Sequence, residues 1–350
     1  MPTRRSELTH RDAGEPAGRS RGRQLGKTLG ITLLIIGALL LIAGPALLNP
    51  YWMRVFSNIF MYAVLAQGIN IMAGYTGYPA FGNVVFFGLG GYVAGVLMAK
   101  FGAPFAIAMP VATALCPLLV IAIGPPLLRL KGHYFAIATL GLNESVKELV
   151  ANATLTGGGM GLSVPLPPWG PVASGAIFYY LFLAVMLVGV WATWEFSRRR
   201  LGIGCGAIRD NEEKAGAIGL HTTRYKTAAW MISAALTGAV GALNAYQLTY
   251  IDPPSAFDMA ISVKSFVIFL LGGAGTVLGP VAGAFIVELL ATYTWSKLLN
   301  WHTGALGALI IAVVMLAPNG LRDALRRVPS LSALREWIDR RRVRTEGTTS

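Results

Sequence analysis

Long apolar stretches that alternate with three clusters of basic residues limit the possible folds of this chain more than any other feature. The clusters span residues 4–27, 198–226 and 322–344, and they contain seven, seven and eight of the 29 Lys and Arg residues. In membrane proteins, basic residues that flank the spans collect on the cytoplasmic side. The pattern therefore predicts an all-α integral membrane protein of the cytoplasmic membrane, with both the N-terminus and the C-terminus in the cytoplasm.

The composition also indicates a membrane protein. Hydrophobic residues make up 54% of the chain and charged residues 13%, which is about half the charged share of a soluble domain. The net charge of +13 would suit nucleic acid, but the basic residues lie beside apolar spans, where anionic lipid headgroups are nearer. We therefore expect membrane lipids, and no nucleic acid, among the partners.

Apolar segments of about 15–24 residues, near the length that crosses ~30 Å of hydrocarbon, predict a polytopic helical bundle of about eight transmembrane helices. A further apolar segment, 261–293, lies between two basic regions and is interrupted by glycines and Gly279-Pro280. This segment is expected to form a re-entrant or broken helix pair, or two full spans. The eight spans are expected at about residues 29–48, 55–72, 84–99, 105–128, 133–150, 173–194, 225–248 and 304–318.

The same pattern divides the chain into three parts. Residues 1–28 are expected to be a basic cytoplasmic tail, disordered because it is polar and charged. Residues 29–318 form the transmembrane domain, with a cytoplasmic loop at 196–224, and residues 319–350 form a second basic cytoplasmic tail.

Two glycine-rich segments, 73–83 and 271–280, interrupt the apolar pattern in the two halves of the chain. Paired interrupted helices indicate a transport site near the midplane, although close helix packing also uses glycine. Helix ends at such breaks can bind the carboxylate and the ammonium group of a zwitterion. The candidate residues of a translocation path are Gly74, Tyr75, Thr76, Gly77, Asn83, Gly272, Gly273 and Gly275.

Catalytic motifs are absent or lack their context, so we expect a transport subunit and not an enzyme. Residues 22–28, GRQLGKT, have three residues between the glycines where a phosphate-binding loop has four. The four histidines and two cysteines are dispersed without metal-ligand spacing. We expect no metal and no cofactor bound by this chain, and any energy for transport must come from another subunit.

The loop at 196–224 is the best candidate for meeting that subunit. Ile208, Ala215 and Ile218 would lie on one stripe of a short amphipathic helix that ends near Gly219. Such a helix can dock in a groove of a partner protein or lie on the lipid surface.

At this loop the chain resembles a known family. Residues 207–243, beginning AIRDNEEKAGAIGL, are similar to the coupling segment and following helix of the LivM-type permease subunit of branched-chain amino-acid ABC importers. The likeness continues, in the family's order, through residues 73–95, 128–144, 155–162 and 269–284.

The resemblance implies a permease in the bacterial cytoplasmic (inner) membrane. Its partners would be a second related permease subunit, two ATP-binding cassette subunits that hydrolyse ATP, and a substrate-binding protein. The residues that would couple it to the ATPase subunit are Arg209, Asp210, Glu213, Ala215 and Gly219.

The expected function is import of branched-chain or other hydrophobic amino acids, driven by ATP on the partner subunits. Asn83 stands where the family commonly has a histidine. Two alternatives stay open: an ABC permease for urea or short-chain amides, and a stand-alone channel or secondary transporter that needs no partner.

Overall fold

The computed structural model describes residues 44–45, 48–297 and 307 of the chain. The chain divides into a short unit, Met1–Asn49, and a main unit, Pro50–Ser350. All elements below belong to the main unit. The expected tails, 1–28 and 319–350, lie outside the described residues, as does almost all of the spans expected at 29–48 and 304–318.

The described residues of the main unit are helical, apart from short connections and one pair of two-residue strands. Strands β1 and β2 pair antiparallel, with Leu162 opposite Ile251. The elements are α2 (Pro50–Ile69), the π-helix η1 (Asn70–Gly74), the 3₁₀-helix η2 (Phe81–Asn83), α3 (Val84–Phe101), α4 (Phe105–Leu127), α5 (His133–Asn152), the 3₁₀-helices η3 (Thr154–Thr156) and η4 (Gly158–Met160), β1 (Leu162–Ser163), α6 (Pro171–Arg198), α7 (Arg200–Asp210), α8 (Glu212–Ala217), α9 (Thr222–Leu248), β2 (Tyr250–Ile251), α10 (Pro253–Ala256), α11 (Met259–Gly272) and α12 (Gly279–Lys297).

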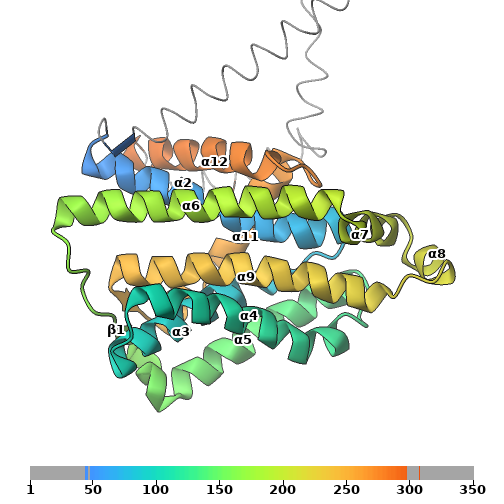
Figure 1. Cartoon of the computed structure of the whole chain (residues 1–350), viewed down its shortest axis with the longest axis horizontal. Helices are drawn as coiled ribbons and strands as arrows, with labels where there is room; N and C mark the ends of the chain where they lie inside the picture. The colour runs from blue at the N-terminus through green and yellow to red at the C-terminus, as the bar shows by residue number, and fades with distance from the viewer. Residues whose placement is uncertain (1–43, 46–47, 298–306, 308–350) are drawn as a thin grey trace, which may run out of the picture. The chain divides into compact units, whose positions relative to one another are not determined.

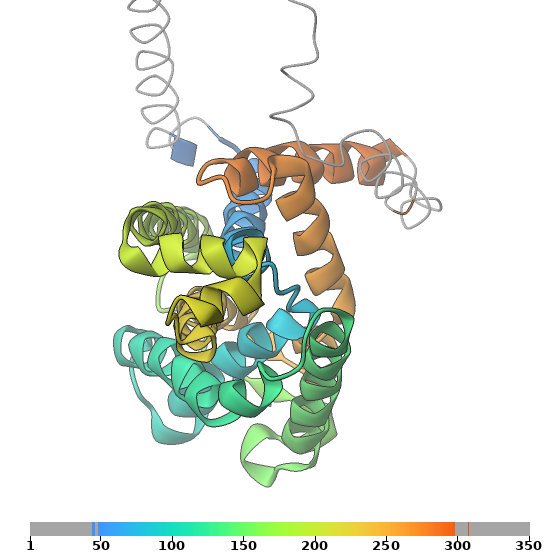
Figure 2. The same cartoon turned by 90° about the vertical axis from the view of Figure 1, so that its right-hand side faces the viewer.

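The long helices lie lengthwise in the main unit, with α7 and α8 beyond the end of α6 (Figure 1). Seen from that end, α3, α4 and α5 lie on one side of α9, and α2, α11 and α12 lie on the other (Figure 2). This arrangement buries α9, which contacts α2, α3, α4 and α6.

The polytopic all-α architecture predicted from the sequence is confirmed. Six helical segments of the described chain are long and apolar enough to cross a membrane: Pro50–Gly74, Phe81–Phe101, Phe105–Leu127, Ala173–Arg198, Thr222–Leu248 and Pro253–Gly272. One expectation differs, because α5 is a helix but does not reach this apolar threshold. Its C-terminal half carries Glu144, Lys147 and Glu148.

Glycines let the backbones of α9 and α3 come into direct contact. A Cβ atom on Gly90 would lie 2.2 Å from the carbonyl oxygen of Gly238, and one on Gly241 would lie 2.0 Å from that of Phe87. Within a membrane the hydrophobic effect does not drive helices together, so their association depends on close van der Waals packing, which small residues allow. Close packing, the alternative that the sequence left open, therefore explains these glycines.

Both predicted interruptions are present. The first helix passes through the π-turn of η1, leaves helical geometry after residue 76 and resumes at η2. The second lies between the end of α11 at Gly272 and the start of α12 at Gly279, where Gly273 and Gly275 have positive φ. We call them the first break (residues 73–83) and the second break (residues 271–280).

Candidate functional site

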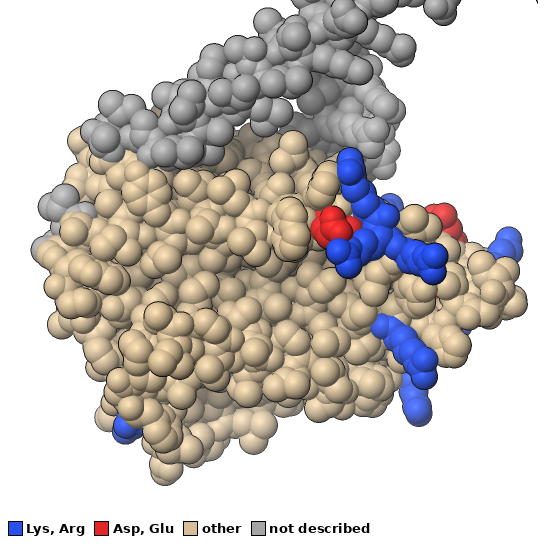
Figure 3. All heavy atoms as spheres, viewed as in Figure 1, with Lys and Arg blue, Asp and Glu red and all other residues tan. Residues whose placement is uncertain are grey.

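The α7–α8 segment (residues 200–217) lies at one end of the bundle, where charge is concentrated. Lys and Arg side chains gather at this end on the face seen in Figure 3, and most of the remaining surface of that face carries neither sign of charge. The basic run Arg198–Arg200 leads into α7. On this face the segment is therefore the charged end of the bundle.

The loop expected to hold one short helix contains two. Asn211 separates them and caps α8, because its side chain accepts a hydrogen bond from the backbone N–H of Lys214 at 2.9 Å. At the other end of α8, Gly219 has a φ of +91°, and the backbone N–H of Leu220 bonds the carbonyl of Ala215 at 3.1 Å. This pattern is a Schellman C-cap, as the sequence predicted near Gly219.

The predicted apolar stripe is only partly buried. Ile208 on α7 and Ala215 on α8 are buried, but Ile218 is 77% exposed. The expectation of one continuous stripe was wrong for Ile218, because α8 ends at Ala217 and Ile218 is its C-cap residue. An exposed isoleucine at a polar end is available to a partner protein.

Arg209, at the end of α7, contacts the first break and the second. Its Nη1 donates a hydrogen bond to the carbonyl oxygen of Gly74 at 2.5 Å. A Cβ atom added to Gly275 would lie 3.3 Å from the same nitrogen, and a Cβ atom added to Gly77 would lie 3.3 Å from Cγ of Arg209. Side chains at these glycines would crowd the arginine, so the glycines make room for it.

Asn70, at the start of η1 and just before the first break, binds the second break. Its Nδ2 donates to the carbonyl of Thr276 at 2.8 Å, and its Oδ1 accepts from the backbone N–H of Gly275 at 2.8 Å. A Cβ atom on Gly74 would lie 2.9 Å from the backbone nitrogen of Gly275. The breaks, about 200 residues apart in sequence, therefore form one polar junction beneath α7.

A second junction holds the start of α8. Lys226 of α9 is 1% exposed and donates to Oε1 of Glu212 at 2.6 Å, to the hydroxyl of Tyr78 at 3.0 Å and to the carbonyl of Leu128 at 3.0 Å. Tyr78 in turn donates to Oε2 of Glu212. The ammonium group thus uses all three of its donors.

Burial and hydrogen bonding act on the acid and the phenol of this junction. Burial alone would raise the pKa of Glu212, but the hydrogen bonds from Lys226 and Tyr78 outweigh it and lower that pKa. Burial, together with the bond to Glu212, raises the pKa of Tyr78. Glu212 is therefore the anion of the cluster, and Tyr78 remains a donor.

The other predicted coupling residues are more loosely held. Glu213 forms an ion pair with Lys131 at 3.2 Å, but both side chains are mostly exposed, and such pairs contribute little. Asp210 is exposed at the end of α7. Asp210 and Glu213 are therefore open to a partner, whereas Ala215 is buried and Arg209, although exposed, is tied to the carbonyl of Gly74.

The predicted path residues do not share one environment. Gly74, Gly77 and Gly275 lie at the Arg209 junction, as shown above. Thr76 is buried and bonds the carbonyl of Met72. Asn83 lies within the α3–α9 packing, where its amide donates to Thr237 and accepts from Ser233.

Asn70, Glu212 and Lys226 were missed by sequence reasoning. Asn70 and Lys226 carried a usable signal, because each is a polar residue inside an otherwise apolar span. Glu212 carried none that separated it from Glu213, since only the direction of the α8 turn decides which carboxylate faces inward.

Ionisable residues within or near apolar segments form two ion pairs. Lys264 of α11 lies 2.5 Å from Glu288 of α12 and 4.2 Å from the ring centroid of Tyr62 on α2. Lys147 and Glu144 pair at 2.6 Å along α5. Each of these four charges therefore has a partner of opposite sign.

Comparison with known proteins connects this geometry to a family. The family model described as "Branched-chain amino acid transport system / permease component" matches residues 51–317. The "High-affinity branched-chain amino acid transport system permease protein LivM" of Escherichia coli (strain K12) is 28% identical over 318 residues, which cover 82% of this chain and 73% of that protein. The LivM protein of Salmonella typhimurium (strain LT2) is 28% identical over 84% of this chain and 75% of that protein.

A second group of relatives matches a smaller part of this chain. The "Autoinducer 2 import system permease protein LsrC" of Klebsiella pneumoniae is 28% identical over 155 residues, which cover 42% of this chain and 44% of that protein. No solved structure matches the chain.

Proposed function

Because the chain belongs to the family of branched-chain amino acid transport permease components, we propose that it is the membrane permease subunit of an ABC importer. The proposed cargo is a branched-chain or other hydrophobic amino acid, carried into the cytoplasm of a bacterium. The chain itself binds no cofactor, and ATP is hydrolysed on partner subunits.

The contact that supports this proposal most directly is the bond from Arg209 to Gly74. The α7–α8 segment is the exposed polar end of the bundle, and Arg209 links it to the breaks in two membrane helices. A push on α7 would therefore displace both breaks together. That is what a subunit driven by a separate ATPase requires.

The proposed partners follow from the family and from the exposed surfaces. Two ATP-binding cassette subunits would contact α7 and α8 through Asp210, Glu213 and Ile218. A second related permease and lipids would cover the apolar outer faces of α4 and α6, where only 22% and 33% of the apolar windows are buried. A substrate-binding protein would deliver the cargo on the opposite side of the membrane.

The nature of the cargo is the finer part of the proposal. The LivM proteins, whose names state branched-chain amino acids, match most of this chain, whereas the LsrC proteins match less than half of it. Urea or short-chain amides are the alternative cargo, and a stand-alone channel or secondary transporter is the alternative class. Uptake of labelled leucine, in competition with urea and unlabelled leucine, distinguishes the two cargoes.

Uptake with and without partners tests the class. We expect ATP-dependent leucine uptake in proteoliposomes that contain this chain, its partner permease, the ATPase subunits and the binding protein. Flux of leucine through the purified chain alone would favour a stand-alone transporter.

Variants at α7 and α8 test the coupling. Arg209→Gln should abolish the coupling of ATP hydrolysis to uptake while the complex still assembles, and Arg209→Lys should retain part of it. Glu213→Lys, or proline in place of Ala215, should weaken binding of the ATPase subunit. Full coupling in Arg209→Gln would contradict the assigned role.

A further inference from the structure

A cavity lies at the end of the bundle away from α7 and α8. It has a volume of about 810 Å³, within the range of small-molecule sites. Its walls come from the starts of α2 and α6, the end of α9 and the loop before α6. Because α6 has 28 residues, at 1.5 Å rise its two ends are about 42 Å apart, so the cavity and the α7–α8 segment open on opposite sides of the membrane.

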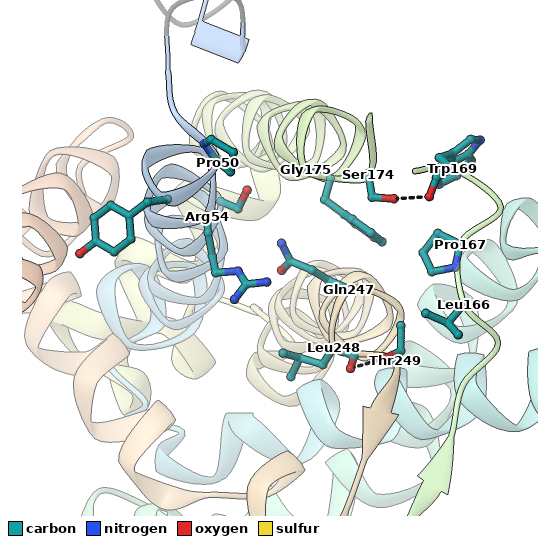
Figure 4. Close-up of a pocket in the computed structure, with 13 residues that line it drawn as sticks. Pro50, Arg54, Leu166, Pro167, Trp169, Ser174, Gly175, Gln247, Leu248 and Thr249 are labelled. Atoms are coloured by element: carbon teal, nitrogen blue, oxygen red, sulfur yellow. Dashed lines mark hydrogen bonds between the residues drawn. The ribbon is translucent and has the colours of Figure 1, made fainter. Parts of the chain in front are cut away.

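Arg54 is the one charged residue among the described residues that line this cavity. Among the residues that the structure describes, no carboxylate lies within 4.0 Å of its guanidinium nitrogens. Figure 4 shows Arg54 of α2 and Gln247 of α9 directed toward the same space. A guanidinium without a partner binds carboxylates strongly, since its planar group matches their geometry.

The ends of the helices around the cavity carry partial charges of opposite sign. The first turns of α2 and α6 contain no acidic residue, so their N-terminal N–H groups leave partial positive charge uncompensated. The last turn of α9 contains no basic residue, so its carbonyl end is partially negative. The cavity therefore has a positive wall at α2 and α6 and a negative wall at α9.

The rest of the lining is largely aromatic and aliphatic. Trp169 and Phe178 contribute rings, and Leu166 and Leu248 contribute branched apolar surface. An apolar wall with few polar groups is suited to a small molecule that has a hydrocarbon side chain.

We propose that this cavity binds a zwitterionic amino acid with an apolar side chain, with its carboxylate on Arg54 and its ammonium group toward Gln247 and the end of α9. The cavity would be the outer receiving site for cargo released from the binding protein. This inference rests on the proposed function, and it assigns substrate recognition to this chain as well as to the soluble receptor.

Equilibrium binding of radiolabelled leucine tests the site without transport. The full chain, in its complex with the partner permease, is placed in nanodiscs of neutral lipid, without ATP and without the binding protein. Arg54→Gln should weaken leucine binding about tenfold or more, and Arg54→Lys should weaken it less. Lys100→Gln is the matched control, because Lys100 is an exposed cation at the end of α3 that does not line the cavity.

Competing ligands identify the group that Arg54 binds. Isovalerate keeps the carboxylate and should displace leucine from the wild type, whereas leucinamide lacks it and should displace poorly. Arg54→Gln should remove this difference. Equal leucine binding by the wild type and Arg54→Gln would overturn the proposal.

Uptake by the complete transporter distinguishes this inference from the proposed function. Uptake by the wild type together with unchanged uptake and binding by Arg54→Gln would overturn the cavity assignment alone. Absence of leucine uptake by the wild type would count against the proposed function, and the binding measurement would still decide the cavity.

Discussion

At the scale of single residues, the ion pair between Glu212 and Lys226 is the most consequential contact found. Lys226 is buried and depends on Glu212 for its counter-charge. Removing one partner of a buried pair costs about 3–5 kcal/mol because the other charge is left uncompensated, and this penalty is absent when both charges are removed. Glu212→Gln should therefore lower the melting temperature of the detergent-solubilised protein, and Glu212→Gln combined with Lys226→Met should recover much of the loss. Equal melting temperatures for all three proteins would contradict this role.

Melting temperatures measured at acidic pH test the same ion pair. Because the pKa of Glu212 in the folded protein is below its ordinary 4.5, its stabilising contribution is present above that pH and is lost as the pH falls through the lowered pKa. The difference in melting temperature between the wild type and Glu212→Gln should be largest at neutral pH and should shrink as the pH falls through the lowered pKa of Glu212. A difference that grew with acid would contradict the direction of the shift.

At the scale of elements, Gly219 determines where α8 ends. A residue with a Cβ atom at a φ of +91° is strained by about 1–2 kcal/mol. Gly219→Ala should therefore fray α8, which faster hydrogen exchange of its amides would report, and should weaken binding of the ATPase subunit. Gly216→Ala is the matched control, since Gly216 has helical geometry and open space around its Cβ position. Equal effects of Gly219→Ala and Gly216→Ala would show that the positive φ at residue 219 does not determine where α8 ends.

The contact between α3 and α9 depends on the absence of a side chain. Gly241→Ala would place a methyl group 2.0 Å from the backbone oxygen of Phe87, which cannot move without moving α3. Overpacking of this kind costs about 1–3 kcal/mol, so we expect a lower melting temperature. Gly141→Ala should leave it unchanged or slightly higher, because nothing lies within 4 Å of that position. Tolerance of Gly241→Ala would mean that the helices are less tightly packed.

At the scale of the whole molecule, the two ends of the bundle should face opposite sides of the membrane. A membrane-impermeant maleimide applied to intact cells should label Met160→Cys, near the cavity end, and should not label Gly216→Cys on α8. In inside-out membranes the pattern should reverse, with labelling of Gly216→Cys and not of Met160→Cys, and both should react in solubilised membranes. Labelling of both from outside would refute the orientation expected from the basic residues.

The two native cysteines do not disturb this measurement. Cys116 and Cys205 are both buried. Burial also raises the pKa of the Cys205 thiol to about 12, so little reactive thiolate is present at neutral pH. The unmodified protein therefore serves as the blank.

Sequence alone determined the features that depend on local composition. Apolar length and basic clusters predicted the helical membrane fold, because a span must be long and uncharged wherever it sits in the bundle. The glycine-rich runs located both breaks, and Gly219 located the end of α8, because these depend on the backbone freedom of the residue itself. The family was also evident, because its motifs are contiguous.

Only the tertiary structure decided which distant residues meet. Nothing local to Asn70 indicates that it binds Gly275, and nothing local to Arg209 indicates that it reaches Gly74. The choice of Glu212 over Glu213 as the inward carboxylate likewise depends on the turn at Asn211 and on the position of Lys226. These contacts join segments up to about 200 residues apart, and packing between helices, not the preference of any one segment, brings them together.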